Sequence, residues 1–124
     1  MSALIEVQDV VLAYPRGPKF GPLSFEIRDG EALALVGGSG AGKSTVVLAL
    51  MDVLKFRGGR KLKGKIRLHC SKKEIAYVPQ DPAAALDPLF TIGNQIRELG
   101  CSETAIRDAL EKVHLPLTQL QLKN

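Results

Sequence analysis

The chain has 124 residues, which is enough for one domain and too few for two. Its 45% hydrophobic and 24% charged residues and its mild net charge of +4 are ordinary for a globular protein and argue against intrinsic disorder. Two distant cysteines do not indicate a disulfide scaffold, and no signal peptide or apolar run of the roughly 18 residues that a membrane span needs is visible, so we expect any link to a membrane to go through a partner.

The first elements in chain order are predicted to be strands. Residues 3–14 are rich in valine and leucine and predict a strand or a strand pair, and the prolines and glycines of residues 15–22 predict a turn region. Residues 23–28 alternate between apolar and polar side chains, which predicts a half-buried strand. Asp29 and Gly30 then predict a hairpin turn.

The middle of the chain predicts a strand–loop–helix unit. Residues 32–36 form a short apolar run that ends in glycines, as expected for a strand buried on both faces of a parallel sheet. Residues 43–54 are apolar almost all round and predict a buried helix that ends before Gly58 and Gly59. Residues 65–70 and 74–78 predict two more strands.

Beyond Pro88 the pattern becomes helical. Thr91 is expected to cap a helix that Gly100 closes, and Ser102 to cap a second helix that ends at Pro116. The second helix carries two pairs of opposite charge at a spacing of four, namely Glu103 with Arg107 and Asp108 with Lys112.

Basic residues are concentrated in residues 55–65. This stretch is expected to be a solvated surface loop, and contact with anionic lipid or nucleic acid is the alternative. Phe56 is the one aromatic residue in this stretch, too few for successive bases to stack on, so we expect no nucleic-acid partner.

The decisive stretch is residues 37–45, which match the phosphate-binding pattern G-x-x-x-x-G-K-[ST], the Walker A motif or P-loop. Glycines let the backbone curl so that successive N–H groups point inward, and the helix that follows adds partial positive charge at its N-terminus. The expected nucleotide-binding residues of the loop are Gly37, Gly38, Ser39, Gly40, Ala41, Gly42, Lys43, Ser44 and Thr45.

Three side chains of the P-loop have separate expected roles. The Lys43 ammonium is expected to reach the β- and γ-phosphates and to act in catalysis. The Ser44 hydroxyl is expected to bind Mg²⁺, and Thr45 to approach the α-phosphate. ATP with Mg²⁺ is therefore the expected cofactor.

A second motif chooses among the P-loop families. Residues 76–82 read Ala-Tyr-Val-Pro-Gln-Asp-Pro, and residues 85–88 continue as Ala-Leu-Asp-Pro. This run resembles the Q-loop region of ATP-binding cassette (ABC) ATPases, in particular of the importers of oligopeptides, dipeptides and nickel. The resemblance covers residues 3–115 and implies an α/β P-loop fold of ABC type, with N-terminal antiparallel strands, a partial parallel core sheet and the start of a helical subdomain.

The resemblance also assigns roles to two further residues. Gln80 would lie beside the γ-phosphate, where its amide oxygen can meet Mg²⁺ or the attacking water, which makes it a catalytic and metal-binding candidate. Tyr14 stands where the family places an aromatic side chain that stacks on adenine, although a tyrosine packed in the core is the alternative. The implied partners are transmembrane permease subunits and a second ABC ATPase subunit, on the cytoplasmic face of the cell membrane.

The resemblance stops before the domain is complete. No signature motif, no apolar strand ending in Asp-Glu and no switch histidine follows residue 116. We therefore expect a truncated nucleotide-binding domain, with residues 1–88 as the ATP-binding core and 89–124 as the start of the helical subdomain, and with little turnover by this chain alone. The implied function is ATP hydrolysis coupled to solute import. The alternatives are an inactive nucleotide-binding remnant and a soluble ABC ATPase of DNA repair or translation.

Overall fold

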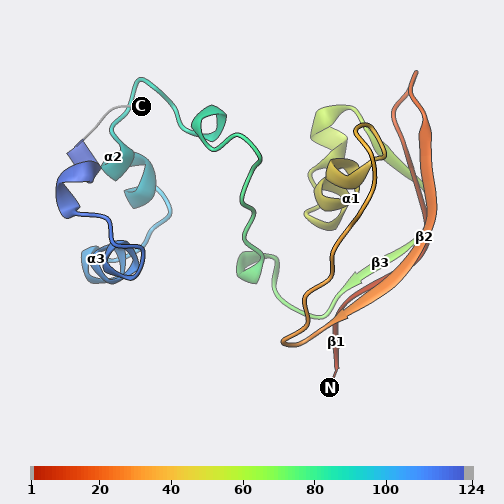
Figure 1. Ribbon diagram of the computed structural model, residues 1–124, viewed down its shortest axis with the longest axis horizontal. Coiled ribbons are helices and arrows are strands. Elements are labelled where there is room, and N and C mark those ends of the chain that lie inside the picture. The colour runs from red at the N-terminus through yellow and green to blue at the C-terminus, as the bar shows by residue number, and fades with distance from the viewer. Residues whose placement is uncertain (1, 122–124) are drawn as a thin grey trace. The chain divides into compact units, whose positions relative to one another are not determined.

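The computed structural model describes residues 2–121, and the chain divides into two compact units between Ala76 and Tyr77. The first unit contains β1 (Ala3–Ala13), β2 (Lys19–Arg28), α1 (Lys43–Leu50) and β3 (Arg60–Leu68), with short 3-10 helices at Leu54–Arg57 and Lys72–Glu74 (Figure 1). The second contains α2 (Ile92–Arg97), α3 (Glu103–Lys112) and 3-10 helices at Ala83–Ala85 and Leu117–Gln121. The subdomain boundary expected after residue 88 stays a prediction.

The three strands form one antiparallel sheet in the order β2-β1-β3. The half-buried strand predicted at residues 23–28 is confirmed, since Leu23, Phe25 and Ile27 are partly buried and their neighbours are exposed. β1 departs from strict alternation, because Val7 and Val10 are both buried although they are an odd number of positions, three, apart. Asp9 lies between them with φ 47° and the pairing with β3 shifts there, so a bulge turns both valines toward the core.

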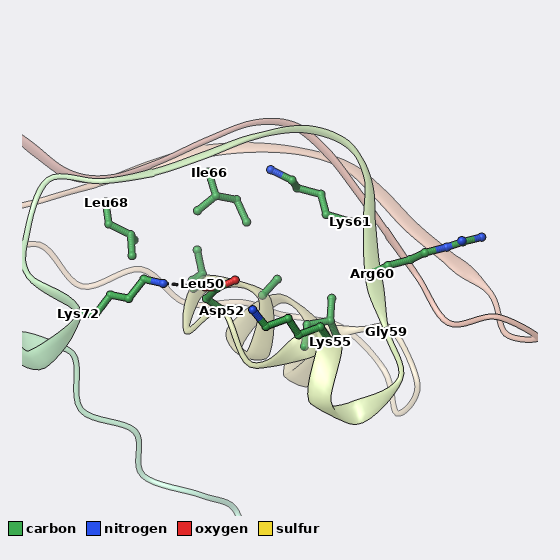
Figure 2. A pocket seen from close by; sticks show the side chains of 11 residues that line it. Leu50, Asp52, Lys55, Gly59, Arg60, Lys61, Ile66, Leu68 and Lys72 are labelled. Carbon is green, nitrogen blue, oxygen red and sulfur yellow. Dashed lines mark hydrogen bonds and ion pairs between the residues drawn. The ribbon is translucent and has the colours of Figure 1, made fainter.

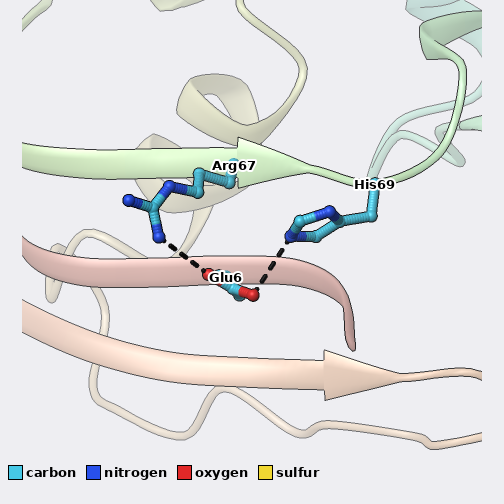
Figure 3. A network of polar contacts seen from close by, with 3 residues as sticks. All are labelled: Glu6, Arg67 and His69. Carbon is cyan, nitrogen blue, oxygen red and sulfur yellow. Dashed lines mark hydrogen bonds and ion pairs between the residues drawn. The ribbon is translucent and has the colours of Figure 1, made fainter. Parts of the chain in front are cut away.

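Side chains on β2 and β3 contact β1 at this bulge and near its N-terminal end. The Ser24 hydroxyl of β2 accepts a hydrogen bond from the Asp9 amide at 2.9 Å and donates one to its carboxylate at 3.2 Å. At the other end of β1, Glu6 accepts from the Arg67 guanidinium at 3.2 Å and lies 3.1 Å from the His69 ring nitrogen (Figure 3). These contacts lower the pKa of Glu6, chiefly through the hydrogen bond from Arg67.

The core of the first unit lies between the sheet and α1, which packs against one face of the curved sheet (Figure 1). Leu12 is completely buried, and Val46 of α1 and Leu54 beyond it close the cluster from the helix side. The predicted buried helix is confirmed only in part. The α-helix ends at Leu50, not at residue 54, and most of its side chains are partly exposed.

Two predicted strands are wrong. Residues 32–36 and 74–78 form no strand in the structure, so the described residues contain no parallel sheet. Val36 and Val78 are 93% and 85% exposed. Asp29 and Gly30 do form a turn, in which the Glu31 amide donates to the Arg28 carbonyl at 3.1 Å, but no second strand follows to make a hairpin. A strand buried on both faces needs paired neighbours, and none lies beside either run within residues 2–121.

The helices of the second unit follow their predicted caps. The Thr91 side chain accepts from the Asn94 amide at the start of α2, and the Ser102 side chain accepts from the Ala105 amide at the start of α3. Gly100 has φ 74° after α2, as a closing residue should. Glu103 forms its hydrogen bond with a partner that was not predicted, because its carboxylate accepts from the Arg97 guanidinium of α2 at 2.6 Å. The predicted partner Arg107 also lowers the pKa of Glu103, through its charge. No helix within residues 2–121 is both long and apolar enough to cross a bilayer.

Candidate nucleotide-binding loop

Residues 37–45 form a curled loop that leads directly into α1. Gly40 and Gly42 have φ values of 79° and 92°, and Gly42 caps the helix. The Ala41 amide donates to the Gly38 carbonyl at 3.2 Å, and the Val46 amide donates to the Gly42 carbonyl at 3.0 Å. The loop thus consists of a tight turn followed at once by the first helical turn. This arrangement places unpaired N–H groups of a helix N-terminus beside a left-handed glycine backbone.

The Lys43 side chain folds back over this loop. Its ammonium donates to the Gly37 carbonyl at 2.6 Å and to the Gly38 carbonyl at 2.7 Å. A straight segment could not bring a lysine side chain within hydrogen-bond distance of carbonyls five and six residues earlier and still start a helix at the same residue. The ammonium therefore lies at the mouth of the loop, where an anion bound to the amides would meet it.

The ring of Phe20 in β2 leaves room only for a glycine at position 42 of this loop. A Cβ at Gly42 would lie 2.3 Å from the ring of Phe20, so any other residue there would displace the loop from the sheet. Phe20 also lines a small cavity of about 100 Å³ below the loop, together with Leu35, Val36 and Val46. Sequence reasoning missed Phe20 as a supporting residue. It lies in a stretch of prolines and glycines that was expected to be a turn, and no periodic pattern singled it out.

The hydroxyl side chains after Lys43 differ in exposure. Ser44 is exposed, whereas Thr45 is only 7% exposed and belongs to the base of the loop. An exposed serine hydroxyl at a phosphate-binding helix start is an oxygen donor of the kind that Mg²⁺ accepts. Within residues 2–121 no three His, Cys, Asp or Glu side chains gather to hold a metal ion by themselves.

Tyr14 lies at the end of β1 and is partly buried against the core of the first unit. Its carbonyl accepts from the Gly17 amide at 3.2 Å, and its ring passes close enough to Gly59 that a Cβ there would lie 3.1 Å away. The Tyr14 side chain is therefore packed against the core and remains partly exposed. A partly buried tyrosine is compatible both with stacking on adenine and with packing in the core, so the role of Tyr14 stays a prediction.

Gln80 lies in the second unit, whereas Lys43 lies in the first. The Gln80 side chain is exposed at a bend, and no strand precedes it. The two expected catalytic residues thus belong to different compact units, and their meeting at one phosphate stays a prediction.

In the same unit as Gln80, the Gln95 side chain holds the turn after Asp87. Its amide group accepts a hydrogen bond from the Asp87 N–H at 2.8 Å and donates to the carbonyls of Asp87 and Phe90 at 2.9 and 3.1 Å.

Comparison with known proteins places these features in a family. The sequence pattern described as ABC transporter matches residues 20–123. The chain is similar to the oligopeptide transport ATP-binding protein AppD of Bacillus subtilis (strain 168), with 33% identity over 117 residues, which are 80% of this chain and 36% of AppD. It is also similar to the glutathione import ATP-binding protein GsiA of Escherichia coli (strain K12), with 38% identity over 95 residues, which are 61% of this chain and 15% of GsiA. The chain therefore spans about a third of AppD and a smaller share of GsiA.

Proposed function

Because this chain belongs to the ABC transporter family, we propose that it supplies the phosphate-binding part of an importer's ATPase subunit, which couples ATP hydrolysis to the uptake of a peptide-like solute. The two relatives named above are ATP-binding proteins of oligopeptide and glutathione transport, and both solutes are peptides. The same proposal places the protein at the cytoplasmic face of a membrane, beside permease subunits and a second ATPase subunit.

The observation that carries this proposal is the loop of residues 37–45. Its left-handed glycines, its helix start and the Lys43 ammonium give a triphosphate both hydrogen-bond donors and positive charge at one place. Lys43 is already held over the loop by two carbonyls. A phosphate would therefore exchange partners with an ammonium that is in position, rather than recruit a mobile one.

We extend the proposal to the remaining predicted residues. Ser44 would offer its hydroxyl to Mg²⁺, and the Gln80 amide oxygen would bind Mg²⁺ or the attacking water. Tyr14 would stack on the adenine ring.

Removing the ammonium tests the proposal directly. In Lys43→Ala, the loss of charge-assisted hydrogen bonds to phosphate should weaken ATP binding by about tenfold to a hundredfold. Titration calorimetry with Mg-ATP on the 124-residue chain measures this, and Lys112→Ala in α3 serves as the lysine control. Equal affinity of the wild type and Lys43→Ala, with the fold intact by circular dichroism, would overturn the assignment.

The role of Tyr14 needs a separate comparison. If its ring stacks on adenine, Tyr14→Ala should weaken ATP by about 1–3 kcal/mol and leave inorganic triphosphate unchanged. Tyr14→Phe keeps the aromatic face and should bind ATP like the wild type. Equal weakening of both ligands in Tyr14→Ala would show that the tyrosine acts only through packing.

A further inference from the structure

A second cavity of about 410 Å³ lies in the first unit between the end of α1 and β3, away from the nucleotide loop (Figure 2). Its floor is apolar and consists of Leu50, Leu54, Ile66 and Leu68. Its rim carries Lys55, Lys61 and Lys72, with Asp52 among them. The volume lies in the range of about 300–1,000 Å³ that is typical of small-molecule sites, and the lining joins apolar surface to a few convergent charges.

The end of α1 explains why a carboxylate stands in this rim. The Val53 amide donates to the Leu48 carbonyl at 3.0 Å and the Asp52 amide to the Ala49 carbonyl at 3.1 Å, which is the Schellman pattern of a helix C-terminus. Asp52 occupies the left-handed position of this motif with φ 59°, where glycine or asparagine is usual. A residue without a charge would close the helix at least as well, so the helix end alone does not call for the aspartate.

A break in the strand pattern explains why Lys61 faces the cavity. Strict alternation would place Lys61 on the opposite face of β3 from Ile66 and Leu68, yet all three line the cavity. Between them Gly64 has φ 86°, and the register with β1 shifts on this part of β3. A Cβ at Gly64 would lie 2.4 Å from the carbonyl oxygens of Gln8 and Asp9, so this distortion is fixed by close backbone packing.

The charges of the rim do not balance one another. Lys72 donates to the Asp52 carboxylate at 2.7 Å, and Lys72, Lys55 and Lys61 together lower the pKa of Asp52. One carboxylate thus faces three ammonium groups, which leaves two positive charges in excess. Arg60 also lines the cavity, but its guanidinium points away from these groups (Figure 2). Among the described residues, neither Lys61 nor Lys55 forms a hydrogen bond or salt bridge through its ammonium. Both act on Asp52 through their charge alone, and Lys55 also lies 5.2 Å from the centre of the Phe56 ring.

We propose that this cavity binds the phosphate monoester of a small apolar alcohol, with the apolar part on the leucine and isoleucine floor and the phosphate among the three lysines. A phosphate monoester carries a charge of about −1.5 to −2 near pH 7, which matches the excess on the rim. Asp52 limits the affinity for such an anion, because its carboxylate competes for the same ammonium groups. The ligand is either free in solution or the headgroup and chain of a membrane phosphatidate, since both present the same chemistry.

The test uses octyl phosphate as the soluble probe, followed by titration calorimetry or by shifts in the NMR spectrum of the 124-residue chain. Octanol tests the contribution of the charge, and inorganic phosphate tests that of the apolar part. Both should bind at least about tenfold more weakly than octyl phosphate, because each lacks half of the recognised groups. Vesicles with and without phosphatidic acid form the second arm and report the membrane source.

Three variants locate the site. Lys61→Ala should weaken octyl phosphate by about fivefold, whereas Lys65→Ala, on the same strand but outside the cavity, should leave it unchanged. Asp52→Asn keeps a residue that tolerates the left-handed position and should tighten binding about threefold to fivefold. Lys43→Ala should not change this affinity, so the result is independent of the nucleotide loop.

The outcomes separate cleanly. Octyl phosphate binding that depends on Lys61 and tightens in Asp52→Asn supports the proposal with a free ligand. The same dependence seen only with phosphatidate vesicles supports it with a lipid. The proposal would be overturned if octyl phosphate bound no more tightly than octanol or inorganic phosphate, or if neither Lys61→Ala nor Asp52→Asn changed its affinity. The exception is a dependence on these two residues that is seen with phosphatidate vesicles.

Discussion

Two apolar segments of the first unit that follow one another, β2 and residues 32–36, have opposite fates. β2 alternates apolar and polar side chains, pairs with β1 along its length and buries one face against the core. Residues 32–36 are apolar without alternation, form no strand and leave Leu33 and Val36 exposed. The two segments lie only a turn apart, so the difference comes from their partners and not from their local propensity.

The comparison teaches which strands a chain can build from nearby sequence. An antiparallel pair joined by a short turn brings its own partner, and one solvated face lets it stand without further cover. A strand meant for burial on both faces needs neighbours on both sides, because its backbone groups and its side chains would otherwise stay in water. The antiparallel sheet therefore forms within residues 2–121, and the parallel one does not.

The largest expected effect is at Leu12 of β1, which is completely buried in a cluster with Val46 of α1. Leu12→Ala should lower the free energy of unfolding by about 2–5 kcal/mol, since a large cavity replaces well-packed atoms. Val36→Ser, in the exposed run, should change it by less than about 0.5 kcal/mol. Urea denaturation followed by far-UV circular dichroism measures both. A loss at Val36 as large as that at Leu12 would mean that residues 32–36 belong to the core.

The next effect concerns the backbone that lets β3 bend around β1. Gly64→Ala adds a Cβ 2.4 Å from two carbonyl oxygens at φ 86° and should lower the free energy of unfolding by at least about 2 kcal/mol. Gly30→Ala is the matched control, because Gly30 has φ 73° but open space around it. It should lose only about 1 kcal/mol. Equal losses in the two variants would show that close packing at Gly64 contributes nothing.

A smaller effect is expected in the second unit, where the start of each helix is determined by a capping residue next to it in the sequence. Ser102→Ala removes the side-chain acceptor for the Ala105 amide and should weaken α3 by about 1 kcal/mol. Faster amide hydrogen exchange in the first turn of α3 is the expected readout. Thr104 lies two residues after Ser102 and is not the capping residue, so Thr104→Ala should not accelerate exchange. Similar exchange in the two variants would contradict the capping role.

These contrasts explain how much the sequence could predict. Patterns that depend on neighbours a few residues away were confirmed: the alternation of β2, the caps Thr91 and Ser102, and the closing Gly100. The glycine loop was expected to curl into a helix, and it does. The bulge at Asp9 could not be predicted, because it depends on a hydroxyl fifteen residues away on another strand.

The errors have the same physical origin. The two missing strands depend on partners, and the pairing of Glu103 with Arg97 depends on how two helices pack, which spacing within one helix does not encode. Phe20 was missed for a related reason, since its importance lies in its contact with Gly42 and not in its own pattern. Of the candidate site, the loop was therefore predictable, and its support and the second cavity were not.

The smallest expected effect is electrostatic and concerns Glu6 on the central strand β1. The pKa of Glu6 is held below its usual value near 4.5, chiefly by the Arg67 hydrogen bond, so the folded state favours the carboxylate. This stabilisation is present above the unfolded pKa and is lost as the pH falls through the lowered folded value. Glu6→Gln should therefore lower the melting temperature slightly at pH 7, and the difference from wild type should shrink below about pH 4.5.

A double-mutant cycle with Arg67→Gln isolates the pair. If Glu6 and Arg67 act together, the second substitution should cost less in the Glu6→Gln background than in the wild type at pH 7. A difference between wild type and Glu6→Gln that stays constant from pH 7 to pH 3 would show that shape, and not charge, accounts for the effect.

The Lys43 ammonium donates hydrogen bonds to two glycine carbonyls before any anion binds, and this has a consequence for the heat capacity change of phosphate binding. Because the loop is already curled and its lysine already seated, little apolar surface has to leave water when an anion arrives. We therefore expect a heat capacity of association close to zero for inorganic triphosphate. ATP should add a negative contribution only to the extent that its adenine buries a ring. Comparing the temperature dependence of the binding enthalpies of inorganic triphosphate and ATP thus separates the contribution of the loop from that of the adenine base.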